Sequence, residues 1–266
     1  MAIPVIDTDT GMVKRHEAFS CRMTEGAEYS RFDMKFLQAG SLPDLVSLQS
    51  VIAANLTCPE IFMRHDEKYL LEILRLDRSV IGVTIEDRLI AYSIIRIPGL
   101  ADDNLGRDIN LPEEELTKVA HLQAAAVHPA YRGNGLQRKL TSAHMHVIDE
   151  LGYEHVCCTV SPKNPISLAN YLSYGLMIEG LHPKLNGWCR YILHKNILRP
   201  KFINMDGPED KVKSRDQEES RVCRNEIKIQ ISDIEGQFDL LKRGFRGFKI
   251  AILPDGAEVF YAKFFF

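Results

Sequence analysis

The sequence predicts an α/β domain, a mixed central sheet flanked by helices, with a β-rich extension at its carboxyl end. Two observations carry this prediction. Runs rich in β-branched residues alternate along the chain with segments whose apolar residues have a helical period. The strand-like run 119–127 also leads through a glycine turn directly into an amphipathic helix. With 45% hydrophobic residues among 266, the chain can bury a substantial core.

The first 118 residues predict short elements around one hairpin. Residues 1–31 are read as an amino-terminal extension of irregular chain, because they show no sustained period. The expected elements that follow are a strand at 34–39, helices at 42–53 and 59–77, and hairpin strands at 80–85 and 89–97. A short helix is expected at Pro112, because three glutamates follow it. The alternative for 101–115 is an acidic rim that selects a cationic amine.

The second half predicts a main domain that ends near residue 200 and an extension beyond it. Its expected elements are the central strand 119–127, a helix from Leu136 to Leu151, a strand at 155–160, a helix at 165–174, and strands at 177–181 and 188–194. The main domain is placed at 32–200, a polar linker at 201–222, and the extension at 223–266 with a hairpin around Pro254 to Gly256. Since so short an extension is rarely stable alone, we expect it to pack on the main domain or on a second subunit in a homodimer.

Composition argues against several classes of function. Net charge is only −3 and basic runs are short, so we expect neither nucleic acid nor a membrane surface as partner. The sequence shows neither a membrane-spanning run nor a signal peptide, and its six cysteines show no C-x-x-C spacing. We therefore expect a cytoplasmic protein with reduced cysteines. No metal is expected, because H-E-x-x-H is absent and the cysteines are scattered.

The turn after the central strand has the composition of an anion-binding site. Gly133 and Gly135 allow close approach of the main chain, and Arg132 adds a charged donor beside a helix start. The dinucleotide fingerprint does not fit, because Arg138 stands where its third glycine belongs. The Walker A pattern does not fit either, because no Gly-Lys-Ser/Thr follows.

The remaining pattern, R-x-x-G-x-Q preceded by V-x-P, resembles the acyl-CoA loop of the GNAT N-acetyltransferases, Q/R-x-x-G-x-G/A. Arg132, Gly135 and Gln137 occupy its three defined places, and Gln137 stands where the family has a small residue. A second patch follows the family spacing N-x-x-A/S-x-x-x-Y-x-x-x-G-F/L. Its matching residues are Asn164, Pro165, Ser167, Tyr171, Gly175 and Leu176. The resemblance covers roughly residues 34–198.

The resemblance implies a GNAT acyl-CoA N-acyltransferase fold with acetyl-CoA (coenzyme A) as co-substrate. The residues it places at the cofactor are Ala126, Val127, His128, Arg132, Gly133, Asn134, Gly135, Leu136, Gln137 and Asn164. Pantetheine is expected to lie along the central strand like an added strand. In the family a bulge in this strand turns one backbone N–H onto the thioester carbonyl, and Val127 is the expected donor.

Tyr171 is the expected catalytic acid, because the family's general acid lies seven places after the asparagine. A tyrosine hydroxyl is protonated at neutral pH and can donate to the leaving thiolate. A purely structural role in the core is the alternative, and Tyr174 is the neighbouring candidate. The expected base is His121, with ordered water or a structural histidine as alternatives. Alternation predicts that His121 shares one face of the strand with residues 123, 125 and 127.

The reaction implied by the resemblance is direct transfer of an acetyl group from acetyl-CoA to a primary amine. A small-molecule and a peptide acceptor are both open, because family membership does not determine the substrate. Two alternatives remain. One is transfer of a different acyl group, and the other is a non-catalytic CoA-binding module that acts through its carboxyl-terminal extension.

Overall fold

A computed structural model describes residues 5–7, 12–14, 20–22, 29–184, 187–198 and 226–264. The chain divides into two compact units, each built from two separate stretches of sequence. Residues 2–98 and 120–153 form the first unit, and residues 99–119 and 154–266 form the second. The expected linker at 201–222 lies outside the described residues, and the domain limits derived from the sequence stay a prediction.

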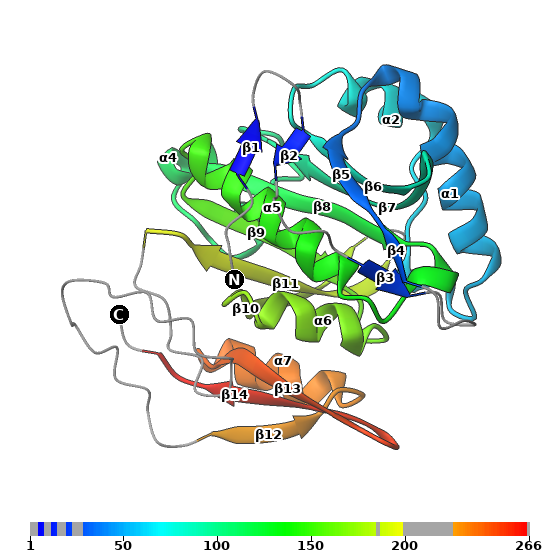
Figure 1. Cartoon of the computed structure of the whole chain (residues 1–266). Coiled ribbons are helices and arrows are strands. Elements are labelled where there is room, and N and C mark those ends of the chain that lie inside the picture. Colours follow the sequence, from blue (N-terminus) through cyan, green and yellow to red (C-terminus); the bar gives the residue numbers. More distant parts are fainter. Residues whose placement is uncertain are drawn as a thin grey trace. The chain divides into compact units, whose positions relative to one another are not determined.

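The sheet of the first unit is antiparallel at every strand pair (Figure 1). In spatial order its strands are β1 (Val5–Asp7), β2 (Met12–Lys14), β5 (Asp33–Phe36), β6 (Val80–Ile85), β7 (Arg88–Arg96) and β8 (Val119–Val127). A separate pair is formed by β3 (Ser20–Arg22) and β4 (Tyr29–Arg31). The expectation of irregular chain before residue 32 is therefore wrong for these positions, which form short strands.

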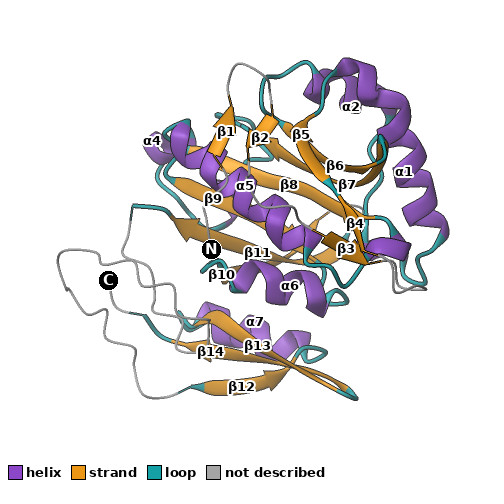
Figure 2. Cartoon of the chain, viewed as in Figure 1, coloured by secondary structure: helices purple, strands orange, loops and turns teal. Residues whose placement is uncertain are grey.

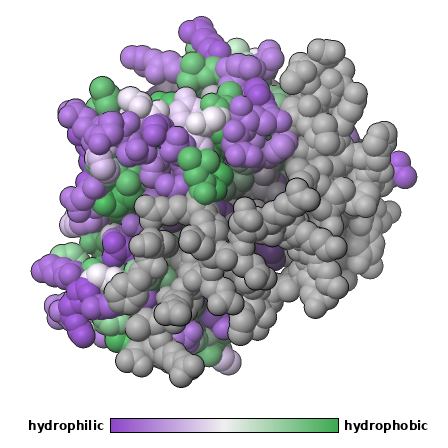
Figure 3. All heavy atoms as spheres, turned by 90° about the vertical axis from the view of Figure 1, so that its left-hand side faces the viewer, coloured by the Kyte–Doolittle hydropathy of each residue, from purple (hydrophilic) through white to green (hydrophobic). Residues whose placement is uncertain are grey.

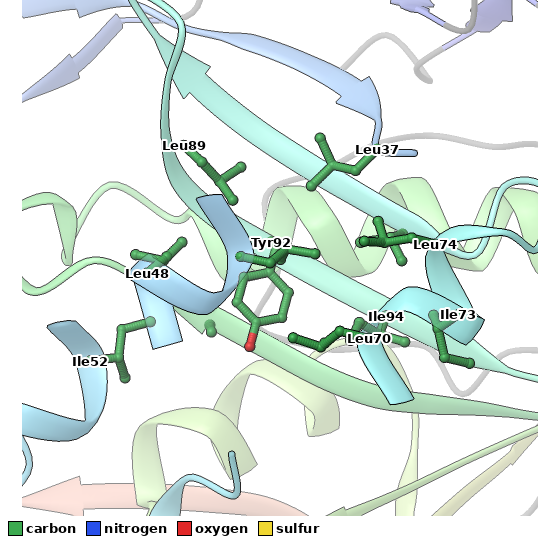
Figure 4. Close-up of a cluster of buried hydrophobic side chains, with 12 residues drawn as sticks. Leu37, Leu48, Ile52, Leu70, Ile73, Leu74, Leu89, Tyr92 and Ile94 are labelled. Carbon is green, nitrogen blue, oxygen red and sulfur yellow. The ribbon is translucent and has the colours of Figure 1, made fainter. Parts of the chain in front are cut away.

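Helices cover both faces of this sheet. Leucines and isoleucines of α1 (Leu42–Ala54) and α2 (Glu67–Leu74) pack around Tyr92 and Ile94 of β7 (Figure 4). Apolar residues of α5 (Leu136–Glu150) pack with Ala91 instead. Because neighbouring residues of a strand point to opposite sides, α1 and α2 lie on one face and α5 on the other.

The second helix is shorter than the sequence predicts. The segment expected as one helix at 59–77 contains a 3₁₀ turn, η2 (Pro59–Ile61), and then α2. The irregular segment between η2 and α2 ends at Asp66. Its carboxylate accepts a hydrogen bond from the Tyr69 N–H at 2.8 Å and caps α2. The buried Gln49 side chain holds this segment in place by accepting from the His65 N–H and donating to the His65 carbonyl. This clamp links positions 16 residues apart and leaves no local sequence pattern.

The sheet of the second unit is also antiparallel throughout its described pairs. In spatial order its strands are β9 (His155–Val160), β11 (Trp188–Asn196), β10 (Met177–Lys184), β13 (Arg246–Leu253), β14 (Gly256–Ala262) and β12 (Ile227–Gln230). The extension joins this sheet where Ile178 of β10 lies opposite Gly247 of β13. The expected hairpin around Pro254 to Gly256 is present as β13 and β14.

The helices of the second unit are short, and Figure 2 shows them beside the strands. They are α3 (Leu105–Asp108), α4 (Glu113–Leu116), α6 (Pro165–Leu172) and α7 (Ile234–Lys242). The segment with α3 and α4 packs on β9 and β11 through Leu105, Cys157 and Ile192. Pro112 caps α4, as the glutamate run predicts. Together the two sheets, their flanking helices and the added carboxyl-terminal strands confirm the predicted α/β class.

The surface is mixed in character. On the face shown in Figure 3, hydrophobic side chains are interspersed among hydrophilic ones where residues are described. Large exposed apolar residues such as Leu76, Ile166 and Phe238 come from different elements. Of the helices that the structure describes, none is long and apolar enough to cross a membrane.

Candidate functional site

Strand β8 contains the β-bulge that the resemblance implies for this strand. Ile94 of β7 lies opposite Ala124 and Ile95 lies opposite Leu122, so Gln123 is an extra residue with no paired residue on β7. Val127 pairs regularly with Ala91, and its expected role as donor to the thioester carbonyl stays a prediction. The irregular backbone lies four residues earlier, inside the strand.

The bulge changes which side chains share a face. Ala125 lies opposite Ser93, whose hydroxyl is 3.0 Å from His144 Nδ1 on α5, so Ala125 faces α5. His121 lies opposite Arg96 of β7. Arg96 is four residues after Tyr92, so both side chains point to the face covered by α1 and α2. His121 therefore points to that face as well. The expectation that His121 shares a face with residues 125 and 127 is wrong, because the extra residue inverts the alternation. The His121 side chain is buried, with 2% of its surface exposed.

The backbone of β8 presents polar groups away from β7. The His128 N–H donates to the Ile90 carbonyl at 2.8 Å. Since N–H groups alternate along an antiparallel strand, those of Ala124 and Ala126 point toward β7, and those of Ala125 and Val127 point away from it.

A 3₁₀ turn, η3 (Pro129–Tyr131), connects β8 to the glycine loop, and two side chains hold it. His128 accepts a hydrogen bond from the Ala130 N–H through Nδ1 at 3.2 Å. Asn134 donates from Nδ2 to the Tyr131 carbonyl at 2.9 Å and to the Arg132 carbonyl at 3.3 Å. The loop conformation is therefore set by its own residues, before any ligand binds.

Both glycines of the loop have a conformation that favours glycine. Gly133 has φ 81° and Gly135 has φ 67°, and Gly135 stands at the N-cap of α5. Among the described residues, no atom lies within 4 Å of the point where a Cβ would sit on either glycine. Gly135 has no side chain that could cap this 15-residue helix, so the start of α5 lacks the usual N-cap oxygen. The geometry is that of an anion site.

The charged side chains beside the loop are positive, as an anion site requires. Arg132 is exposed at the loop itself, and Arg88 of β7 approaches His128 Nε2 at 3.4 Å. Burial, together with the cations of Arg88 and Arg132, lowers the pKa of His128. His128 therefore stays neutral near pH 7 and keeps its Nδ1 lone pair for the Ala130 N–H. The His128 ring is half-buried and hydrogen-bonded within the loop.

The remaining expected site residues, Asn164 and Tyr171, belong to the second unit, whereas the loop and His121 belong to the first. Asn164 caps α6, because its Oδ1 accepts from the Ser167 N–H at 3.1 Å. Tyr171 lies on α6 with 5% of its surface exposed. Tyr174, the neighbouring candidate, is half-buried after the end of α6, and its carbonyl accepts from Lys195. Neither catalytic assignment is tested by these positions, and both stay predictions.

One group of acids and a histidine in the second unit is close enough to suggest a cation site: Glu115, Glu154 and His155. The Lys118 ammonium lies 3.3 Å from a carboxylate oxygen of each glutamate. Within the described residues this group is thus an ion-pair cluster with its own cation, and we assign no metal to it. The acidic-rim interpretation of 101–115 also loses support, because Glu115 and Asp108 are paired internally, with His155 and Lys184.

The fold and the glycine loop agree with the resemblance that the sequence motifs carry. Residues 48–176 match the model of the acetyltransferase (GNAT) family. The matched segment contains both the Arg132 loop and the Tyr171 motif. Comparison with curated proteins finds no match.

Several solved structures are similar in fold. The ribosomal-protein-S18-alanine N-acetyltransferase from Escherichia coli is 17% identical, with 67% of this chain and 99% of that chain covered and a TM-score of 0.45. Ard1 from Thermoplasma volcanium is 15% identical, with 63% and 99% covered and a TM-score of 0.48. The PaiA N-acetyltransferase from Thermoplasma acidophilum, in complex with coenzyme A, is 13% identical, with 62% and 98% covered and a TM-score of 0.45.

Proposed function

We propose that this protein transfers an acetyl group from acetyl-CoA to a primary amine. The observation that carries the proposal is the loop between β8 and α5. Two glycines with positive φ, an exposed arginine and a helix start with glycine at its N-cap lie together in a segment that matches the GNAT family model. The pyrophosphate of CoA fits this loop, because its charge meets backbone N–H groups, the helix dipole and Arg132.

The thioester end of the cofactor is assigned to β8. Pantetheine carries amide groups that can pair with the N–H groups of Ala125 and Val127, since both point away from β7. The small side chains at 124–126 leave room for a chain beside the strand. The bulge at Gln123 is our candidate for the thioester carbonyl, because a bulge turns a backbone N–H out of the regular ladder.

The chemical step then follows with few groups. The neutral amine attacks the thioester carbon, a C–N bond forms, and the C–S bond breaks. A backbone N–H of the bulge stabilises the negative charge on the carbonyl oxygen in the transition state. Tyr171 donates its proton to the leaving CoA thiolate, and His121 or an ordered water takes the proton of the ammonium. The amide and free CoA are the products.

Calorimetric titration with acetyl-CoA tests the proposal. Wild-type protein is compared with the double variant Arg132→Ala, Gly135→Trp, and with Arg243→Ala, which removes one exposed arginine from the extension. We expect binding by the wild type and the control, and at least a tenfold weaker affinity for the double variant. Folded wild-type protein that does not bind acetyl-CoA would sink the proposal. Release of free CoA thiol with a panel of small amines and peptides then identifies the acceptor class.

A further inference from the structure

A continuous row of hydrogen-bonded ionisable side chains crosses the second unit. His155 Nε2 lies 3.0 Å from Glu115 Oε2, and His155 Nδ1 lies 2.9 Å from His194 Nε2. At the other end, His194 Nδ1 lies 2.9 Å from Glu179 Oε1, and Arg246 Nε lies 3.4 Å from Glu179 Oε2. The two imidazole rings are stacked, with centroids 5.2 Å apart. We call these five residues the histidine row.

The fold brings these residues together from distant parts of the chain. His194 of β11 lies opposite Cys157 of β9, so His155, two residues earlier on β9, is its diagonal neighbour on the same face. Glu179 is the extra residue of a bulge in β10, since Ile178 and Gly180 pair with consecutive residues of β11. A bulge re-aims a side chain, and this one directs the Glu179 carboxylate to His194.

The number of protons in the row decides its charge. The three contacts among Glu115, the two histidines and Glu179 each need one hydrogen atom. Two neutral imidazoles carry two ring protons, and ionised carboxylates carry none. One neutral ring and one protonated ring carry three. The row is therefore fully hydrogen-bonded only when it holds one proton more than two neutral rings supply.

The surroundings locate this proton on the rings. Burial raises the pKa of Glu179, but the hydrogen bond from His194 and the charge of Arg246 outweigh it, so the pKa of Glu179 is lowered. Glu179 is thus ionised and accepts from both neighbours. Burial is also the largest influence on His155 and lowers its pKa.

Other charged groups near the row do not change this count. Lys118 neutralises Glu115 and Glu154 in part, and Lys184 pairs with Asp108 at 2.7 Å. The remaining titratable neighbour, Cys157, is a buried thiol whose pKa is raised by burial. The surroundings hold one more negative than positive charge, which one protonated histidine balances. The carboxylates are Glu115, Glu154, Glu179 and Asp108, and the cations are Lys118, Lys184 and Arg246.

We infer that His155 and His194 together carry three ring protons at neutral pH, one more than two neutral rings carry, and that this shared proton stabilises the attachment of the carboxyl-terminal extension to the sheet. Arg246 and Gly247 begin β13, and Glu179 follows Ile178, so the end of the row lies at the pairing that joins β13 to β10. When the proton is released to solvent as pH rises, one of the three contacts is left with two facing lone pairs and no hydrogen atom. That repulsion weakens the row and, through Glu179 and Arg246, the β10–β13 junction.

Histidine-selective ¹⁵N NMR on the full chain counts the protons directly. At pH 7.5 we expect three protonated nitrogens among the four of His155 and His194, assigned with His155→Gln and His194→Gln. His146→Gln is the control, because this half-exposed ring on α5 lies outside the histidine row and pairs with Glu150 at 3.1 Å. Two protonated nitrogens in the wild type at this pH overturn the inference.

The variant Glu179→Gln separates a proton from a merely structural role. Its amide can donate to a neutral His194, so the row becomes complete with only two ring protons. We expect the third proton to disappear in this variant while the protein stays folded. A third proton that persists in Glu179→Gln overturns the inference as well.

Hydrogen exchange tests the link to the extension. After correction for intrinsic rates, protection of the amides of β10 and β13 should fall about tenfold as the wild type loses the shared proton. In Glu179→Gln this pH dependence should vanish. Equal pH dependence in both proteins, or a change that depends on an added metal chelator, contradicts the proposed fastening by a proton.

Discussion

Tyr191 and Gln237 are joined by a 2.7 Å hydrogen bond, although 46 residues separate them. Tyr191 lies on β11, and Gln237 lies on α7 of the extension. The same amide oxygen accepts from the Tyr261 hydroxyl at 2.9 Å, and the amide nitrogen donates to the carbonyls of Ile231 and Asp233. Burial raises the pKa of both tyrosines, which remain protonated donors. One fully buried glutamine thus ties the extension to an inner strand of its unit.

Gln237→Leu should lower the free energy of unfolding by about 2–4 kcal/mol, because it leaves two buried hydroxyls without their acceptor and the Ile231 carbonyl without this donor. Urea denaturation followed by circular dichroism measures this. Gln230→Leu is the matched control, since Gln230 is exposed and its side-chain amide donates to Glu258 at 3.3 Å. A loss below about 0.5 kcal/mol in Gln237→Leu would show that the amide does not hold the extension.

Tyr92→Phe should make the protein more stable, by about 1 kcal/mol. The Tyr92 hydroxyl is fully buried among α1 and α2 side chains and has no hydrogen-bond partner among the described residues (Figure 4). Removing a buried polar group without a partner recovers its desolvation cost. Thermal unfolding of the two proteins without ligand measures the difference. A clear loss of stability in Tyr92→Phe would mean that the hydroxyl is bonded in solution.

His144 should make stability depend on pH below neutrality. Burial lowers the pKa of His144 to about 3, whereas the unfolded chain has the ordinary value near 6.5. The unfolded state alone takes up this proton between those values, so the contribution is complete above pH 6.5 and is lost as pH falls. The expected slope is about 1.4 kcal/mol per pH unit between pH 6 and 4.

The slope is measured as the difference between wild type and His144→Asn, whose amide oxygen can still accept from Ser93. His146→Gln removes a half-exposed histidine of the same helix and serves as control. Wild type and His144→Asn should differ in slope, and the control should follow the wild type. Parallel curves for all three proteins would contradict the buried, neutral state of His144.

Tyr171→Phe should lower turnover about 100-fold or more while acetyl-CoA binding stays within a factor of two, because it removes a proton donor and little else. Tyr174→Phe, three residues away, is the matched control and should keep most of its activity. Initial rates of CoA release with an accepted amine measure both. Loss in Tyr174→Phe with full activity in Tyr171→Phe would transfer the acid role. Binding of acetyl-CoA without turnover of any amine would favour the non-catalytic alternative.

Local patterns predicted most elements of the fold, because their causes lie within a few residues. The period of apolar positions predicted α1 and α5, and β-branched runs flanking residues 86–88 predicted the β6–β7 hairpin. Glycine chemistry predicted the loop before α5, where Gly135 adopts the left-handed conformation. Two motifs predicted the family whose model matches residues 48–176, since motif spacing is a property of the sequence itself.

Tertiary structure decided what depends on register and on distant partners. The bulge at Gln123 reversed the face expected for His121, because an extra residue changes alternation only relative to the opposing strand. The break before α2 depends on Gln49, and the histidine row joins α4 to four strands. None of these contacts repeats at a helical or strand period. By itself the sequence determined most helices and strands and the glycine loop between β8 and α5. Pairing between distant strands determined which side chains contact one another.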